Sequence, residues 1–180
     1  MTALLELPSP TASDSRSPEI REWEDCADYY EGPIGYDLER NPAMSIVLED
    51  ERVGDLVAEN YHDPDAFMGR LQGDLRQGDR RLAANLMTVI RNEAIESSAR
   101  TLALVALAGA RVRTLDSTVC ELIREMLGSR EPNLQFTAVA AASDLSRRSQ
   151  VLLAGVIRAL ADSNQDQWVQ RAAKAFLSRL

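Results

Sequence analysis

Residue types that usually carry chemistry are scarce in this chain of 180 residues. Only 5% of the residues are aromatic, the two cysteines are Cys26 and Cys120, and the single histidine is His62. Two cysteines cannot build the disulfide framework of a small secreted domain, so we expect a reducing compartment and a buried, apolar role for Cys120. His62 begins the sequence His-Asp-Pro-Asp at an expected helix start, and we predict that its role is structural.

The motifs of common catalytic sites are missing as well. The sequence has no glycine-rich phosphate loop, no Gly-x-Ser-x-Gly elbow and no Cys-x-x-Cys pair. We therefore predict that the protein is not an enzyme and that it holds neither a metal nor a cofactor. No apolar run approaches the roughly 18 residues that a membrane span needs, and residues 1–10 lack the pattern of a secretory signal. We expect a cytoplasmic protein with no membrane partner.

What the chain does contain is one helical pattern repeated three times. Apolar and small residues recur at spacings of three, four, seven and eleven, which place them on one face of an α-helix. The second set lies thirty-nine residues after the first, and the third lies thirty-five after the second. The sets are Ile95, Ser98, Ala99, Leu102 and Ala106; Leu134, Thr137, Ala138, Ala141 and Leu145; and Val169, Ala172, Ala173, Phe176 and Leu180. Each predicts an amphipathic helix that is rich in small residues.

A second series of amphipathic helices alternates with the first, at offsets of thirty-seven and then thirty-four residues. Its side chains are larger: Leu82, Leu86, Val89 and Ile90; Val119, Leu122, Ile123, Met126 and Leu127; and Leu153, Val156, Ile157, Leu160 and Ala161. A single helix pair cannot bury its apolar stripe, whereas stacked pairs share a core, so this period predicts an α-solenoid. An ordinary helical bundle with accidental self-similarity is the alternative.

Residues that typically start helices occur where the period requires them. Asp79 precedes the first expected helix, and Pro132 opens a later one. Two pairs, Thr118 with Glu121 and Ser163 with Asp166, have the spacing of a capping box, in which two side chains satisfy free N–H groups at a helix start. We predict that these pairs begin the helices that follow them.

The stretch from Trp168 to Leu177 resembles the second helix of a HEAT repeat, whose usual form is a Val-Arg pair followed by two alanines and a terminal leucine. Here Gln170 separates Val169 from Arg171, and the earlier copies keep alanines without the arginine. The resemblance covers residues 79–180. It implies an all-α fold, a right-handed α-α superhelix of about three helix pairs. So degenerate a motif supports a fold more strongly than a function.

The N-terminal part of the chain departs from the repeat. Residues 1–43 are acidic and rich in proline and serine, and we predict an irregular segment there. Residues 44–78 predict two helices, one ending near Asn60 and one running from Asp63 to Gln77. We interpret these two as a degenerate pair that caps the stack, because a terminal repeat has to present a polar face to water.

Charge is distributed unevenly between the two halves of the chain. Residues 1–80 hold nineteen acidic and seven basic side chains, whereas residues 81–180 hold nine and thirteen. The formal net charge of −8 therefore combines an acidic half with a mildly basic one. An acidic protein of this kind is expected to capture a partner with a basic surface.

Two sets of residues are predicted to contact a partner. In HEAT-like stacks the second helices line the concave surface, and the resemblance places five polar residues there: Glu96, Arg100, Gln135, Gln170 and Lys174. The other set comes from the run between residues 23 and 36, in which aromatics alternate with acids. As a recognition segment it supplies the anchors Trp23, Tyr29, Tyr30 and Tyr36. The alternative is a loop that packs on the first helix pair.

These features favour a non-catalytic protein-binding module, such as an acidic bacterial immunity protein or antitoxin that neutralises a basic partner. Nineteen arginines against one lysine also suggest a GC-rich bacterial genome. The alternative is a HEAT-like nucleic-acid-binding protein, or a glycosylase or lyase that uses Trp168 and Asp166 in its concave surface. Duplex binding usually takes about six to ten phosphate contacts, and the arginines of the array fall in different helical registers, so we do not expect a nucleic-acid partner.

Overall fold

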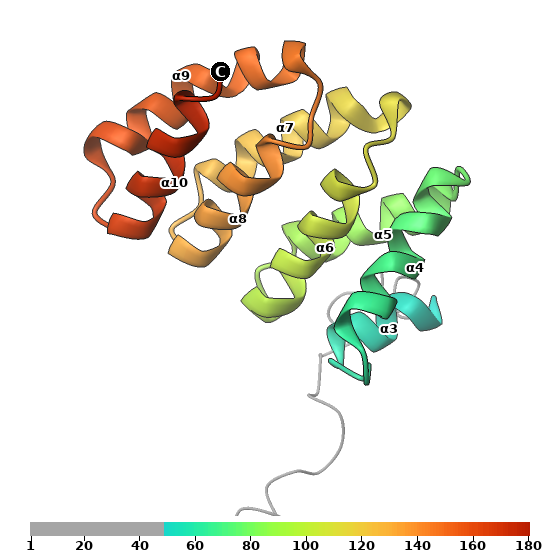
Figure 1. Ribbon diagram of the computed structural model, residues 1–180. Coiled ribbons are helices and arrows are strands. Elements are labelled where there is room, and N and C mark those ends of the chain that lie inside the picture. Colours follow the sequence, from blue (N-terminus) through green and yellow to red (C-terminus); the bar gives the residue numbers. More distant parts are fainter. Residues whose placement is uncertain (1–48) are drawn as a thin grey trace, which may run out of the picture. The chain divides into compact units, whose positions relative to one another are not determined.

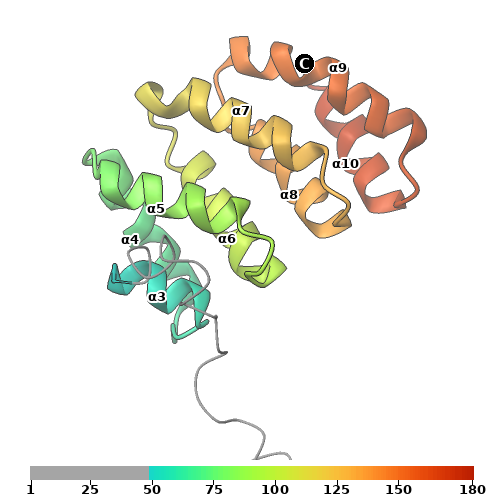
Figure 2. The same ribbon diagram turned by 180° about the vertical axis from the view of Figure 1, so that it is seen from behind.

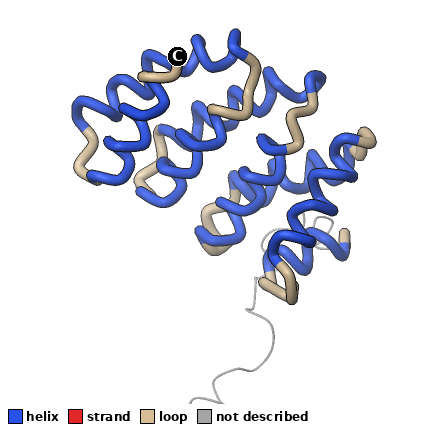
Figure 3. The backbone as a smooth tube through the Cα atoms, in the orientation of Figure 1, coloured by secondary structure: helices blue, strands red, loops and turns tan. Residues whose placement is uncertain are grey.

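The computed structural model describes residues 49–180 of the chain. In this range the regular elements are eight α-helices and one short 3-10 helix, and no strand occurs among the described residues (Figure 3). The predicted all-α class is therefore confirmed. None of the helices in this range is long and apolar enough to cross a bilayer. The predicted irregular segment, residues 1–43, lies outside the described residues.

The helices follow one another in pairs. The first pair comprises α3 (Glu51–Val57) and α4 (Pro64–Arg76), followed by α5 (Arg80–Arg91) with α6 (Ser97–Gly109), α7 (Asp116–Leu127) with α8 (Pro132–Ala142), and α9 (Arg147–Ser163) with α10 (Gln167–Leu177). The 3-10 helix η1 (Arg113–Leu115) leads directly into α7. The two N-terminal helices lie close to where the sequence predicts them, with Asp63 as the N-cap of α4.

The pairs pack on one another as successive layers. Figures 1 and 2 show α6, α8 and α10 side by side on one face, and α5, α7 and α9 on the other. The second helices α6, α8 and α10 each contact the first helix of their own pair and the second helices of the neighbouring pairs, and α4 contacts α5 and α6. This arrangement is compatible with an α-solenoid, because each layer buries its apolar faces against its neighbours.

The repeat period differs from the predicted one in the first copy. The second helices begin at Ser97, Pro132 and Gln167, so both offsets are thirty-five residues. The predicted offset of thirty-nine is therefore wrong by four residues. A shift of four is about one helical turn and returns to nearly the same face, so periodicity alone does not distinguish the two registers. The offsets predicted for the first helices are confirmed, since Leu82, Val119 and Leu153 are all buried at equivalent positions.

A line of alanines forms the seam between the layers. Ala103, Ala138 and Ala173 occupy equivalent positions in α6, α8 and α10, and all three are fully buried. Alanine has the smallest side chain of the apolar residues that favour helices, so these helices approach closely while the larger leucines and isoleucines of α5 and α7 fill the space within each pair.

The helix starts are confirmed in part. Asp79 caps α5 by accepting a hydrogen bond from the backbone N–H of Leu82 at 2.9 Å, and Pro132 is the first residue of α8. Both predicted capping boxes are wrong. Because η1 runs straight into α7, that helix begins at Asp116 and encloses Thr118 and Glu121. Ser163 is the last residue of α9, and α10 is capped by Asp166 alone, which accepts from the N–H groups of Trp168 and Val169.

One arginine holds the N-terminal layers together. The Arg52 guanidinium contacts carboxylates before α3, in α4 and before α5: Asp50 at 2.9 Å, Asp74 at 2.7 Å and Asp79 at 2.9 Å. The hydrogen bond from Arg52 lowers the pKa of Asp50 below its ordinary value. The backbone N–H of Leu82, with Arg52, lowers the pKa of Asp79. These ions therefore stabilise the folded state when they are charged.

Ala138→Leu is expected to destabilise the fold by about 1 to 3 kcal/mol, because the larger side chain overfills the seam between α8 and its neighbours. The matched control is Ala140→Leu, the same substitution two residues further on the exposed face of α8, which is expected to change the free energy of unfolding by less than about 0.5 kcal/mol. Urea unfolding followed by circular dichroism measures both. Equal effects at the two positions would contradict the alanine seam.

Leu145→Ala tests the apolar core on the other side of the same layer. Leu145 follows α8 and is buried, so truncation leaves a cavity and is expected to cost roughly 2 to 5 kcal/mol in the same unfolding experiment. Val151→Ala, which shortens an exposed side chain at the start of α9, provides the control and is expected to be nearly neutral. A neutral Leu145→Ala variant would show that this position is not part of the core.

Arg52→Met is expected to lower the melting temperature by about 2 to 4 °C at neutral pH, since several partly exposed ion pairs together contribute on the order of 1 kcal/mol. The pKa values of Asp50 and Asp79 are lowered in the folded state. The stabilisation is thus present above their ordinary pKa of 3.8 and is lost as the pH falls below it. The melting temperatures of the native protein and of Arg52→Met should therefore differ at pH 7 and converge at pH 3. Arg81→Met, which removes only the long exposed ion pair with Glu49, should melt at the same temperature as the native protein at both pH values.

Candidate functional site

The residues predicted to bind a partner fall into several different environments. Trp23, Tyr29, Tyr30 and Tyr36 lie outside the described residues. Of the other five, Glu96 precedes α6, Arg100 belongs to α6, Gln135 to α8, and Gln170 and Lys174 to α10. Four of the five thus lie in second helices and Glu96 lies just before one, but the five do not share one surface.

Three of them occupy a single repeat position and bind the backbone of their own layer. Arg100, Gln135 and Gln170 are spaced by thirty-five residues. The Nε of Arg100 donates to the carbonyl oxygen of Ile90 at 2.9 Å. The amide of Gln135 donates to the carbonyls of Leu127 and Ser129, and that of Gln170 donates to the carbonyl of Asn164 at 2.6 Å. Each side chain therefore satisfies carbonyl groups where a first helix ends, which otherwise lack helical partners.

The same repeat position also links each layer to the next. The guanidinium of Arg100 forms an ion pair with Glu131, which lies at the start of α8. One layer further on, the amide of Asn164 donates to the side-chain oxygen of Gln135 at 2.8 Å. Arg100 is only 3% exposed, so its charge is held inside the chain by these partners. Burial raises the pKa of Glu131, but hydrogen bonds from Ser97 and Arg100 outweigh it, and the net shift is downward.

Glu96 and Lys174 are exposed, in two different places. Glu96 stands at the N-cap position of α6 but makes no side-chain capping bond. Lys174 is the repeat equivalent of Leu104 and Val139, which are buried in the earlier layers. Because no described layer follows α10, this position faces outward there, at the end of the stack. The partner-binding role of all five residues stays a prediction.

A different set of residues makes up the outer surface of the second helices. Three rows at the same thirty-five-residue spacing point away from the core, and we call them the second-helix face: Ser98, Thr101 and Val105 in α6; Asn133, Phe136 and Ala140 in α8; and Trp168, Arg171 and Ala175 in α10. All are exposed except Thr101, which is half-buried. Only Arg171 carries a charge, so this face is weakly charged compared with the whole chain, in which 27% of the residues are charged.

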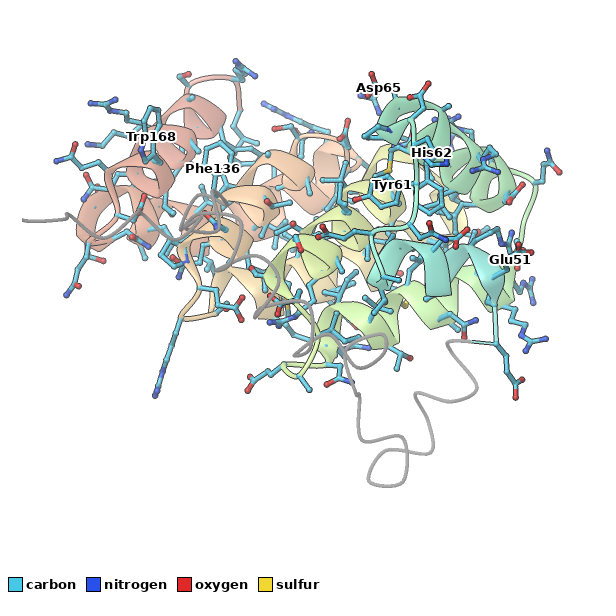
Figure 4. All side chains as sticks on the ribbon, turned by 90° about the horizontal axis from the view of Figure 1, so that it is seen from below. Glu51, Tyr61, His62, Asp65, Phe136 and Trp168 are labelled. Carbon is cyan, nitrogen blue, oxygen red and sulfur yellow. The ribbon has the colours of Figure 1, made fainter. Side chains whose placement is uncertain are left out.

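Two large aromatic side chains stand out on the second-helix face. Trp168 is 67% exposed and Phe136 is 42% exposed. Figure 4 shows them on one side of the stack, on the neighbouring helices α10 and α8, with Tyr61, His62 and Asp65 at the far end. The guanidinium carbon of Arg171 lies 5.4 Å from the ring centroid of Trp168, over its face. Trp, Phe and Arg are the side chains that commonly anchor protein interfaces.

The sequence-based prediction places only polar residues of the helical repeats in the interface and does not include Phe136. Trp168 is part of the HEAT-like stretch and of the alternative catalytic pair with Asp166, but it is not predicted to contact a partner. The signal that identifies these residues is the corrected offset: once α6, α8 and α10 are aligned at thirty-five residues, the exposed positions fall into three rows. The five polar residues predicted from the sequence lie one or two positions before residues of the second-helix face, on the side that faces a loop or the next layer.

The residues proposed for enzymatic chemistry do not converge in the structure. The Asp166 carboxylate accepts two backbone hydrogen bonds as the cap of α10, at 2.8 and 3.1 Å, while the Trp168 ring extends into solvent. His62 is exposed, and the neighbouring Asp63 caps α4 as predicted, through bonds from the N–H groups of Asp65 and Ala66. Within residues 49–180 there is no group of three or more metal-binding side chains.

Comparison of the chain with protein-family models, with curated proteins and with solved structures finds no match. The HEAT resemblance of residues 168–177 therefore remains an interpretation of the motif itself.

Arg100→Ala is expected to destabilise the protein by about 1 to 3 kcal/mol, because it removes charge-assisted hydrogen bonds to Ile90 and Glu131 in a buried setting. Arg171→Ala, on the exposed second-helix face, is the matched control and is expected to stay within about 0.5 kcal/mol of the native protein. Chemical unfolding of the three proteins makes the comparison. An Arg100→Ala variant as stable as Arg171→Ala would contradict the role of Arg100 as a link between layers.

Proposed function

We propose that the protein is a non-catalytic binding module of the HEAT type, and that its second-helix face binds another protein. The single observation that carries this proposal is the exposure of Phe136 and Trp168 on neighbouring helices of an otherwise weakly charged face. Large aromatics lose little conformational entropy on binding and bury much apolar surface, so exposed aromatics on a rigid scaffold are typical interface anchors.

Rigidity of the face supports the same proposal. The helices that display Phe136 and Trp168 are fixed by the buried alanines Ala138 and Ala173 and by the links through Gln135 and Asn164. A preformed surface binds without a large ordering cost. We propose further that the layers wind into a right-handed superhelix, as in HEAT proteins, with the second-helix face on the concave side.

The charge of the proposed partner follows from the N-terminal layer. Exposed carboxylates gather there on Glu51, Glu59, Asp63 and Asp65, and Figure 4 shows Glu51 and Asp65 on this part of the molecule. A partner that combines basic residues with an apolar patch would meet the carboxylates at one end and the aromatics at the other. Such complementarity speeds capture. An acidic immunity protein or antitoxin directed at a basic toxin is the proposed biological form of this activity.

Trp168→Ala and Phe136→Ala are each expected to weaken partner binding by about thirtyfold or more, the loss typical of an interface anchor. The partner is first identified by affinity capture from the native host with mass spectrometry, and its dissociation constant is then measured by calorimetry. Ala159→Ser, an exposed change on α9, is the control outside this face and should leave the affinity unchanged.

Glu96→Arg separates this proposal from the interface predicted by sequence. If Glu96→Arg abolishes binding and the two aromatic variants do not, the contact surface lies at the start of α6 instead. Two outcomes would overturn the proposed function. One is an affinity capture that yields no protein in stoichiometric amount, and the other is turnover of a small-molecule substrate by the protein.

A further inference from the structure

The first-helix side of the stack carries a group of arginines in repeat register. Arg113 and Arg147 are thirty-four residues apart, as are Arg124 and Arg158, which is the offset of α7 and α9. Arg147 and Arg158 are eleven residues apart in α9, about three helical turns or 16 Å along one face, and Arg113 in η1 and Arg124 in α7 have the same spacing in sequence. Arg148 adds a fifth. Neighbouring helices lie about 10 Å apart, so these arginines spread over a surface about 16 Å long and about 10 Å wide.

None of these five arginines forms an ion pair within residues 49–180. The ion pairs of the described range use Arg52, Arg81, Arg91, Arg100 and Arg111 instead. Arg147 donates only to the backbone carbonyl of Arg179. A group of like charges that has no ion-pair partner within residues 49–180 costs stability there through mutual repulsion, so it is a candidate site for an anionic partner.

Three of the arginines line a groove. It has a volume of about 500 Å³ and lies between η1, α7 and α9, with Arg113, Arg124 and Arg148 around it and Leu152 and the buried Cys120 in its wall. Two carboxylates also line the groove, so its three guanidinium groups exceed them by one: that of Glu121 and that of Asp116, which accepts hydrogen bonds from the N–H and hydroxyl of Ser146 and from the hydroxyl of Ser149. Burial raises the pKa of Asp116, but these bonds outweigh it and lower the pKa overall.

Exposed apolar side chains adjoin the arginines. Val151 is 57% exposed, Leu152 is 56% exposed, and Val156 follows Leu152 by one helical turn. Apolar groups add nothing to a contact with phosphates, but they match the alternating acidic and apolar side chains of an amphipathic peptide.

We propose that this groove, which we call the arginine groove, binds an acidic peptide segment of a partner protein. The carboxylates of the bound peptide pair with Arg113, Arg124 and Arg148, and an apolar side chain of the peptide packs on Leu152. This surface is separate from the second-helix face, and the proposal does not depend on the function proposed for that face.

A peptide suits the arginine groove better than a nucleic acid. The exposed aromatics Phe136 and Trp168, which bases would stack on, belong to the opposite face. Five arginines are also fewer than the roughly six to ten phosphate contacts of a typical duplex-binding protein.

Fluorescence anisotropy with three labelled probes tests the proposal at about 0.1 M salt. The probes are a twelve-residue peptide of alternating Glu and Leu, the same peptide with Lys in place of Glu, and a twenty-nucleotide single-stranded DNA. The Glu peptide is expected to bind, and the double variant Arg124→Glu/Arg148→Glu is expected to weaken it at least tenfold. Arg171→Glu, the same charge reversal on the other face, should leave it within twofold.

The variant Arg124→Gln/Arg148→Gln keeps the test valid should the charge reversal impair folding, and circular dichroism melts check both. Leu152→Ser separates the apolar contact from the charge contact, and a reduction of about threefold is expected. Binding of DNA in preference to the Glu peptide would overturn the proposal and make the surface a nucleic-acid site. Three other outcomes would overturn it as well. The Glu peptide could bind the arginine variants as tightly as the native protein, the Lys peptide could bind as tightly as the Glu peptide, or no probe could bind at all.

Discussion

Close packing of small side chains between successive layers is the constraint on which the rest of this structure depends. Ala103, Ala138 and Ala173 remove almost all side-chain bulk from one line through the stack, so α6, α8 and α10 lie side by side. Within each of these layers a short loop places the start of the second helix next to the end of the first helix. There Arg100 and Gln135 reach backbone carbonyls of their own layer and also touch the following layer. Apolar packing sets the spacing, and these polar links set the register.

The layer geometry decides which residues remain available to a partner. A position that faces the next layer is buried in α6 and α8 but exposed in α10, as Leu104, Val139 and Lys174 show. A position that faces away from the stack stays exposed in every layer, which is why Phe136 and Trp168 lie on a continuous surface. The opposite side, built from α7 and α9, carries arginines in place of aromatics. One repetitive scaffold therefore displays two surfaces of different chemistry, and each suits a different kind of contact.

The absence of convergent catalytic groups in residues 49–180 agrees with this view of the fold. Polar side chains that are well placed for chemistry are committed to structure: Asp166 and Asp63 cap helices, Asp116 holds the start of α9, and Asp50 and Asp79 surround Arg52.

The amino-acid sequence by itself determined the all-helical class, the alternation of helices with large and with small apolar side chains, and three of the helix starts, because apolar periodicity and capping residues act over a few neighbouring positions. Asp63, Asp79 and Pro132 begin helices as their local chemistry predicts. Only the tertiary structure decided the register of the first copy, the burial of Arg100 and the exposure of Phe136. A shift of one helical turn preserves the apolar stripe, and whether a side chain on that helix faces a carbonyl, another layer or water depends on neighbours about thirty-five residues away.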